Sequence, residues 1–180
     1  MNTKKLLITF IFAAGLTALP LTAQSLAVSE GIPAADGTIG AAEYTWKTDQ
    51  KGAALYLSLS SDGTVLYAAL DTPAAGWAAV GLGSKKMNGA FMVLGSDDAG
   101  KTEISEQTGK GFSHKPNAEK ILQSQAVKEN GGRTVLEFSV PAAKFIKNGN
   151  IDVIAAWAKK DSFSSKHSKY ISVSVPVQTK

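Results

Sequence analysis

From residue 50 onward, apolar and polar residues alternate along most of the chain. In the stretch ALYLSLS, for example, Leu55, Leu57 and Leu59 fall on the same side of an extended backbone. The same period of two recurs at residues 134–140, 151–158 and 170–177. This period is typical of β-strands with one buried face, whereas an amphipathic helix repeats its apolar positions every three or four residues.

Turn sequences separate these predicted strands. SDGT at 61–64, DDAGK at 97–101 and ENGGR at 129–133 each offer Gly or Asn where a hairpin needs a positive φ angle. Short strands at a spacing of about ten residues indicate an antiparallel sandwich or barrel. The one helical turn that we expect is PAAKFI at 141–146, because Pro141 suits the first position of a helix.

The N-terminus departs from this pattern. Lys4 and Lys5 precede an apolar run over residues 6–21, which a proline interrupts and small residues follow. The pattern is typical of a secretory signal peptide, whereas a membrane span needs about 20 unbroken apolar residues. We expect cleavage after Ala23, with Ala27 as the alternative, and export to the periplasm or out of the cell.

The predicted mature chain, residues 24–180, is long enough for one domain with a sizeable core. Without the leader it carries 17 basic and 15 acidic residues, so its net charge is +2. No basic run is interleaved with aromatic residues, which makes nucleic acid a poor candidate partner. The absence of cysteine excludes disulfides, thiolate metal sites, covalently attached haem and a cysteine nucleophile.

Catalytic motifs are sparse. His114 and His167 are the only histidines, and neither H-E-x-x-H nor G-x-S-x-G occurs. Asp97 and Asp98 lie in a turn, which explains them without catalysis. GLGSKK at 81–86 lacks the spacing of a phosphate-binding loop and precedes a strand pattern rather than a helix. We therefore expect a binding or carrier protein and not an enzyme.

Two side chains remain as candidates for a site. Met87 follows the basic turn GLGSKK, and His167 lies in a polar segment before the last predicted strand. Alone, a methionine is usually a core filler and a loop histidine is usually solvated. Together, a thioether sulfur and an imidazole nitrogen are one of the axial pairs that hold haem iron. We expect their two loops to meet at one end of the sandwich.

The stretch GWAAVGLGSKKMNGAFMVLG at 76–95 resembles the core signature of DOMON domains, secreted β-sandwiches that include the cytochrome domain of cellobiose dehydrogenase. TGKGFSHKP at 108–116 and AWAKKDSFSSKHSKYISVSV at 156–175 resemble further segments of this family, so the likeness covers about residues 50–177. DGTIGAAEYTW at 36–46 is similar to the entry of related carbohydrate-binding sandwiches. The resemblance implies an all-β, immunoglobulin-like antiparallel sandwich of about 9–11 strands with at most one short helix.

In haem-binding members of the family, the methionine after the Gly-rich turn and the histidine before the last strand are the axial ligands. These positions fall on Met87 and His167. The resemblance therefore implies an exported protein that binds haem b and passes single electrons to a separate partner protein. With haem bound, Trp77 and Phe91 would line an apolar pocket around the porphyrin; the alternative for Trp77 is packing in the core of the sandwich. Two filled axial positions leave no open site on the iron, and a thioether ligand favours a comparatively high potential.

Four lysines flank the two predicted ligands, and we expect them near the negatively charged propionates at the rim of the cofactor: Lys85, Lys86, Lys166 and Lys169. The sequence departs from the family at Phe91, where many members carry an acidic or amide residue. Whatever polar contact that residue makes is absent from this chain.

Two alternatives remain open at this point. In the first, His114 and His167 form a pair of imidazole ligands, which would lower the potential and leave Met87 without a role. In the second, the protein is a cofactor-free module that binds a carbohydrate or another small ligand. Trp46, Tyr44 and Tyr67 would then provide a flat platform for stacking against sugar rings.

Overall fold

The computed structural model describes residues 24–178, so the signal peptide predicted at residues 1–23 lies outside the described residues. The strands are β1 (Trp46–Gln50), β2 (Ala53–Leu59), β3 (Val65–Thr72), β4 (Ala78–Leu82), β5 (Phe91–Asp98), β6 (Lys101–Lys110), β7 (Ser113–Pro116), β8 (Ser124–Asn130), β9 (Arg133–Pro141), β10 (Ile146–Lys147), β11 (Asn150–Trp157) and β12 (Lys169–Pro176). A single 3-10 turn, η1 (Ala142–Lys144), stands where the sequence predicts a helical start.

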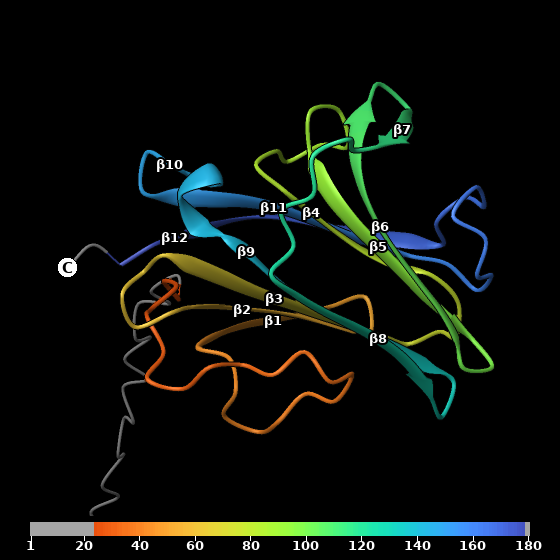
Figure 1. Ribbon diagram of the computed structural model, residues 1–180, viewed down its shortest axis with the longest axis horizontal. Helices are drawn as coiled ribbons and strands as arrows, with labels where there is room; N and C mark the ends of the chain where they lie inside the picture. The colour runs from red at the N-terminus through yellow and green to blue at the C-terminus, as the bar shows by residue number, and fades with distance from the viewer. Residues whose placement is uncertain (1–23, 179–180) are drawn as a thin grey trace, which may run out of the picture.

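The strands form two antiparallel sheets that pack face to face (Figure 1). One sheet has the order β1-β2-β3-β9-β8, and the other has the order β10-β11-β4-β5-β6-β7 with β12 also paired to β11. The predicted antiparallel sandwich is confirmed. The strand count exceeds the predicted range because of β10, which has only two residues.

The inward faces of both sheets supply one apolar core. The alternation that the sequence predicts is present: Leu55, Leu57 and Leu59 are buried between the sheets, as are Leu136 and Phe138. The three predicted turns connect β2 to β3, β5 to β6, and β8 to β9. Burial of these side chains is the main stabilising contribution, at about 1.5–3 kcal/mol for each large aliphatic residue.

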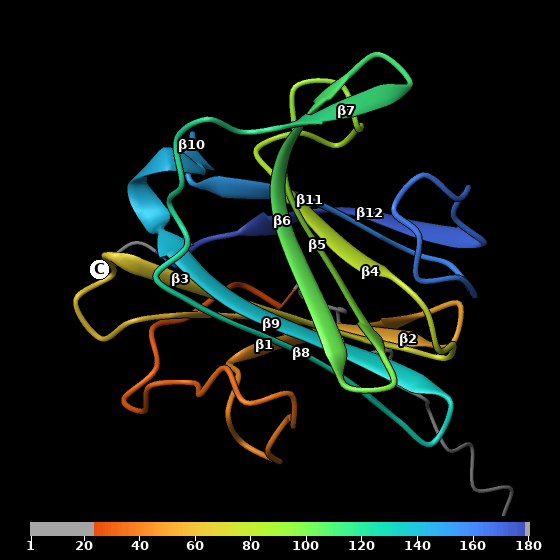
Figure 2. The same cartoon turned by 45° about the vertical axis from the view of Figure 1, so that its right-hand side comes forward.

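Residues 24–45 run over the outward face of the five-stranded sheet (Figure 2). The Glu137 side chain on β9 holds this segment, because its Oε2 atom accepts hydrogen bonds from the backbone N–H groups of Asp36, Gly37 and Thr38. Its Oε1 atom accepts the hydroxyl of Tyr44 at 2.9 Å. Glu137 is fully buried, so these donors offset the cost of removing a carboxylate from water.

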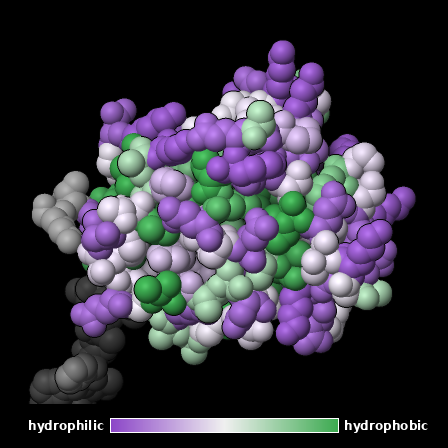
Figure 3. Space-filling view, in the orientation of Figure 1, coloured by the Kyte–Doolittle hydropathy of each residue, from purple (hydrophilic) through white to green (hydrophobic). Residues whose placement is uncertain are grey.

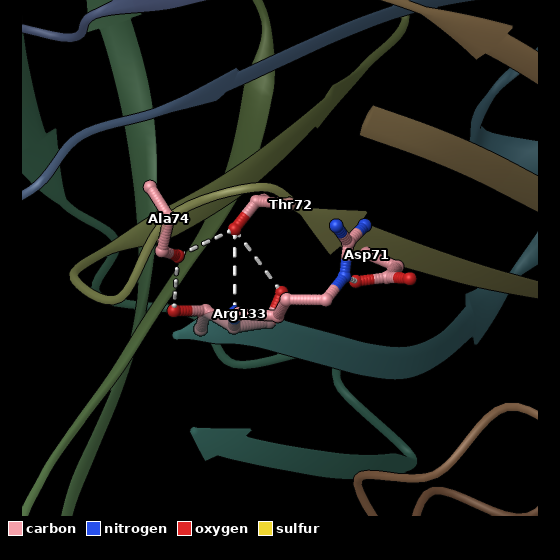
Figure 4. A network of polar contacts seen from close by, with 5 residues as sticks. Asp71, Thr72, Ala74 and Arg133 are labelled. Carbon is pink, nitrogen blue, oxygen red and sulfur yellow. Dashed lines mark hydrogen bonds and ion pairs between the residues drawn. The ribbon is translucent and has the colours of Figure 1, made fainter. Parts of the chain in front are cut away.

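The chain passes from the first sheet to the second through residues 73–77, and a polar network fixes this crossover (Figure 4). The Thr72 hydroxyl lies 2.9 Å from the carbonyl oxygen of Ala74, and the Thr134 hydroxyl lies 2.8 Å from that of Gly76. Beside them, Arg133 Nε donates to Asp71 at 2.8 Å. The network thereby fixes the backbone that leads to Trp77, the residue directly before β4.

Within residues 24–178, no helix is long and apolar enough to cross a membrane.

Candidate functional site

A second apolar cluster lies on the outward face of the seven-stranded sheet, away from the main core. We call it the outer patch. Its buried members are Trp77, Ala79, Ala90, Met92, Leu94 and Ala158, and the partly buried side chains packed against it are Met87, Ile154, Ala156 and Phe163. The six buried members are at most 8% exposed, so neighbouring side chains of the chain itself cover most of this cluster.

The alternation within β4 explains how the patch arises. Ala78, Val80 and Leu82 point into the main core, so Trp77, Ala79 and Gly81 point outward. Two of these outward residues, Ala79 and Gly81, are small, which leaves room above them for side chains of the neighbouring strands.

Gly81 lies at the centre of this floor, opposite Ile154 on one side and Met92 on the other. A Cβ atom at Gly81 would stand 2.6 Å from Ile154 Cγ1 and 3.2 Å from Met92 Cγ. The two neighbouring side chains therefore close over Gly81.

Met87 reaches this floor from the loop between β4 and β5. The backbone of Met87 packs closely over Gly109 of β6. A Cβ atom at Gly109 would lie 1.8 Å from the carbonyl oxygen of Met87. The same carbonyl accepts the N–H of Ala90 at 3.1 Å, and Gly89 N–H donates to the Gly109 carbonyl at 2.9 Å. The Asn88 side chain accepts the N–H of Gly111 at 2.8 Å. The loop is thus fastened to β6 and its end by the two residues that follow the methionine.

The Met87 loop extends across the outward face of the sheet. Ser172 of β12 donates its hydroxyl to the carbonyl of Lys85 at 3.0 Å, while Met87 lies over Gly109 of β6. The loop therefore contacts both β12 and β6, which are not neighbours in the sheet.

His167 lies in the loop between β11 and β12, whose base is fixed against Trp77. The backbone N–H of Trp77 donates to the carbonyl of Lys160, and the indole Nε1–H donates to the hydroxyl of Ser165 at 2.9 Å. Gly76 permits this close approach, because a Cβ atom there would lie 2.6 Å from the carbonyl oxygen of Ala158. Gly76 also has a φ of 131°, which a residue with a side chain rarely adopts.

The imidazole of His167 is exposed and meets the ring of Tyr170 edge-on, with 5.7 Å between ring centroids. The ammonium of Lys51 lies 4.5 Å from the centre of the same tyrosine ring. Among the described residues, no hydrogen bond engages a ring nitrogen of His167 or the sulfur of Met87. Both donor atoms therefore keep their lone pairs.

The two loops enter the outer patch from opposite ends of the strands, which corrects the expectation that they meet at one end. Leu82, which precedes the Met87 loop, pairs with Val153 near the start of β11, whereas the His167 loop follows Trp157 at the end of β11. Strand β4 between them has only five residues, or about 13 Å between its end Cα atoms. Figures 1 and 2 show the two loops flanking the same sheet.

The donor types suit a haem group. Met87, which offers a thioether, packs against the outer patch, and His167, which offers an imidazole, is exposed in a loop that borders the patch through Phe163.

The four predicted rim lysines are all exposed but differ in direction. Lys85 pairs with Asp152 of the outward face at 3.9 Å, and Lys86 follows it in the loop. Lys166 lies directly beside His167. Lys169 turns away from the patch, because its ammonium donates to the carbonyl of Lys51 in the turn between β1 and β2.

Phe91 is a second correction. It pairs with Leu82 and points into the main core, where its ring lies 5.4 Å from that of Phe145. Trp77 lies in the outer patch as expected. Phe91 lies on the opposite face of the sheet and does not belong to the outer patch.

The predicted sugar-stacking platform is not formed. Trp46 is buried in the main core and Tyr67 is buried on β3. Tyr44 donates its hydroxyl to the buried Glu137, and burial, followed by the negative charge of Glu137, raises the pKa of Tyr44. The three rings are therefore not free to stack on a ligand.

His114 lies on β7 opposite Gly109, at the same end of the sheet as Met87. Its Nδ1 atom is hydrogen-bonded to Gln107 Oε1, which can only accept, so Nδ1 carries the proton. The Nε2 lone pair stays available. His114 is thus a chemically competent rival of Met87, but not a partner facing it across the patch.

Two shallow hollows lie elsewhere in the described part of the chain. One, of about 540 Å³, opens between β6 and β8 and is lined by Ile104, Leu122 and neighbouring polar residues. Figure 3 shows hydrophobic residues gathered in the middle of the face in view, among hydrophilic ones.

The other hollow, of about 280 Å³, lies between two hairpin ends and includes Asp97 and Glu129. Asp97 accepts the N–H of Gly100, the turn role expected from the sequence. Burial raises the pKa of Glu129, and the nearby Asp161 carboxylate acts in the same direction. No group of three or more His, Cys, Asp or Glu side chains in residues 24–178 is arranged to hold a metal ion.

Comparison with known proteins agrees with the geometry at the level of the fold. No protein-family model matches the sequence, and no curated protein does. Among solved structures, the chain is similar to the cytochrome domain of Myriococcum thermophilum cellobiose dehydrogenase, with a TM-score of 0.60 and 12% identity. It is also similar to the cytochrome b domain of Coprinopsis cinerea pyranose dehydrogenase, with a TM-score of 0.58 and 16% identity. Each alignment covers 74% of this chain and 81% of the other. The chain therefore has the fold of these cytochrome domains, and the resemblance to DOMON-type sandwiches holds at that level.

Proposed function

We propose that this protein is an exported one-electron carrier that binds haem b on the outer patch, with the sulfur of Met87 and the imidazole of His167 as the axial ligands. The observation that carries the proposal is that Met87 packs against the outer patch while the loop that holds His167 borders the same patch through Phe163. The similarity in fold to two cytochrome domains supports it.

The side chains of this site have separate tasks. Met87 supplies a neutral sulfur, and its loop is fixed to β6 by hydrogen bonds of Gly89 and Gly111. His167 supplies a nitrogen from a loop anchored to Trp77. The outward apolar residues of β4 and β11 would supply the surroundings that exclude water from the group. When bound, haem would supply reversible one-electron chemistry, and two protein ligands would leave no position for oxygen.

The lysines at the two loops balance the charge of the bound group. Lys85, Lys86 and Lys166 are exposed next to the two proposed ligands, so their ammonium groups would balance the negative charge of the propionates. Each exposed pair contributes little, at about 0–1 kcal/mol. Lys169 takes no part, because it bonds to Lys51.

The leader predicted at residues 1–23 puts this carrier in the periplasm or outside the cell, where it exchanges electrons with a separate protein. The cofactor-free carbohydrate module is the weaker hypothesis, since its three proposed aromatic residues are buried or engaged.

The test is a haem titration of the purified protein, followed by absorption spectra of the oxidised and reduced forms. We expect saturation at one haem per chain and a low-spin type b spectrum. Met87→Ala and His167→Ala should each lose the low-spin signature while keeping the β-sheet circular dichroism of the parent. His114→Ala is the control and should keep the signature. A protein that stays colourless, or binds an oligosaccharide instead, contradicts the proposal.

A further inference from the structure

The charge of the chain is distributed unevenly around the outer patch. Three segments border it: residues 84–88, 110–115 and 158–169. Together they contain eight lysines and one acidic residue, for a net charge of +7, whereas the rest of residues 24–180 carries nine basic and fourteen acidic residues, for a net charge of −5. We call these three segments the basic rim.

The structure brings these segments together from distant parts of the sequence. The first forms the Met87 loop, the second is the tip of the β6–β7 hairpin, and the third is the His167 loop. The Asn88 side chain ties the first two segments together by accepting the N–H of Gly111. The third borders the other end of the patch through Phe163, which packs against it.

The one acidic residue of the rim does not offset this charge at the patch. Asp161 lies beside Glu129 at the end of the β8–β9 hairpin. Among the described residues, only Lys85 of the rim lysines forms an ion pair, and that pair with Asp152 is long and exposed. Lys169 donates to the carbonyl of Lys51, and the remaining six lysines form no ion pair among the described residues.

The rim also carries an apolar anchor. Phe112 at the tip of the β6–β7 hairpin is fully exposed and stands between Lys110 and Lys115. Exposed aromatic side chains flanked by charges are typical of the residues that dominate protein interfaces.

The opposite pole has the opposite sign. Residues 24–45, which cover the outward face of the five-stranded sheet, contain Glu30, Asp36 and Glu43 and no lysine or arginine. Such a separation of charge orients a protein as it approaches a charged partner and raises the rate of association.

We propose that the basic rim is a docking surface for an acidic redox protein, which presents carboxylates around its own electron-exchange site and receives Phe112 in an apolar recess. The electron exchange in this proposal rests on the proposed function. The charge separation that guides docking is a property of the chain, with or without a cofactor.

The first test uses the haem-free protein, so that it stands apart from the proposed function. An oligoglutamate peptide is titrated into the 15N-labelled chain at low salt. We expect the amide shifts to change in the three rim segments, and the changes to be abolished by high salt. The double variant Lys159→Glu/Lys160→Glu should bind about tenfold more weakly. The matched control is Lys47→Glu/Lys120→Glu. It has the same net charge as the first variant, but its two charge reversals lie outside the rim, so it should bind like the parent. Shifts spread over the whole surface, or equal losses in the two variants, overturn the proposal.

The second test uses the haem-loaded, reduced protein with two small oxidants. Ferricyanide, a trianion, takes one electron and becomes ferrocyanide, and tris(phenanthroline)cobalt(III), a trication, takes one electron and becomes the cobalt(II) complex. We expect the ferricyanide rate to fall and the cobalt rate to rise as ionic strength increases. Lys159→Glu/Lys160→Glu should weaken both trends. The opposite trends would overturn the docking surface while leaving the haem site intact, whereas a chain that takes up no haem contradicts only the proposed function.

Discussion

Met87 rests directly over Gly109, so closely that no side chain is tolerated at the glycine: a Cβ atom there would lie 1.8 Å from the carbonyl oxygen of Met87. This contact fixes the position of the Met87 backbone relative to the outer patch. The glycine belongs to β6, so the register of a strand distant in sequence determines where the sulfur lies.

Gly109→Ala should therefore displace the Met87 loop. Because the clash is with backbone, which cannot rotate away, we expect a loss of about 1–3 kcal/mol in the free energy of unfolding. Haem should then bind without the low-spin signature. Chemical denaturation and absorption spectra measure the two effects. Gly31→Ala is the matched control, since only the Ser29 hydroxyl lies near, at 3.9 Å, and it should change neither quantity.

Trp77→Phe should loosen the His167 loop without removing the apolar floor. The substitution deletes the indole N–H that donates to Ser165 at 2.9 Å, a bond worth about 1 kcal/mol. We expect a several-fold weaker haem affinity, and Ser165→Ala should reproduce it. Trp46→Phe loses the comparable bond to the Gln24 carbonyl and should lower stability but not haem affinity. Equal haem affinities in all four proteins would contradict a role for Trp77 in placing the loop.

Glu137 should make stability depend on pH. Burial raises the pKa of Glu137 above its ordinary value of 4.5, although bonds from Tyr44 and from the Gly37 and Asp36 N–H groups act in the other direction. The folded protein then binds the proton more tightly than the unfolded chain. The stabilisation from this group is present below about pH 4.5 and is lost as the pH rises through the raised value.

Urea unfolding of the parent and of Glu137→Gln across this range tests the sign. We expect the advantage of the parent over the variant to shrink toward neutral pH. An advantage that grows with pH would mean that the hydrogen bonds outweigh burial. Because the amide NH2 group only donates, whereas a protonated carboxyl can still accept at both oxygens, the variant should be less stable by about 1–3 kcal/mol at the acid end.

Tyr44→Phe isolates the link between the N-terminal segment and the sheet. It removes the hydroxyl that donates to Glu137 and keeps the ring, which packs against Tyr56 at 5.6 Å. We expect a loss of about 0.5–1.5 kcal/mol and faster hydrogen exchange at Gly37 and Thr38. Unchanged exchange at these amides would show that the segment is held by other contacts.

The sequence patterns predicted the sandwich because alternation reports which residues share a face. They failed where a strand is buried on both faces. Residues 78–82 of β4 are buried throughout, and their small outward residues give no polar alternation from which an outer patch could be recognised.

The misplacement of Phe91 has a related cause. Trp77 and Phe91 flank the same motif, but β4 and β5 pair so that Leu82 faces Phe91. This register puts Phe91 in the core and Met92 on the patch. A sequence motif carries no information about register when the loop between two strands is eight residues long and irregular.

The burial of Trp46 and Tyr67 also lay beyond the pattern. It depends on residues 24–45, which have little secondary structure and whose path is fixed by side-chain bonds to Glu137 and by a bridge from Val28 to Leu59. The N–H groups of Gly37 and its neighbours donate to a side chain about 100 residues further along the chain. Local sequence propensities do not predict contacts between residues so far apart.

The most direct measurement of the central claim is the iron coordination of the haem-loaded protein, compared between the parent, Met87→Ala, His167→Ala and His114→Ala by X-ray absorption at the iron edge. We predict one sulfur scatterer in the first shell of the parent and of His114→Ala, and none in Met87→Ala. Loss of the nitrogen ligand should occur only in His167→Ala. An iron with two imidazole ligands and no sulfur in the parent, changed by His114→Ala and not by Met87→Ala, would contradict the account.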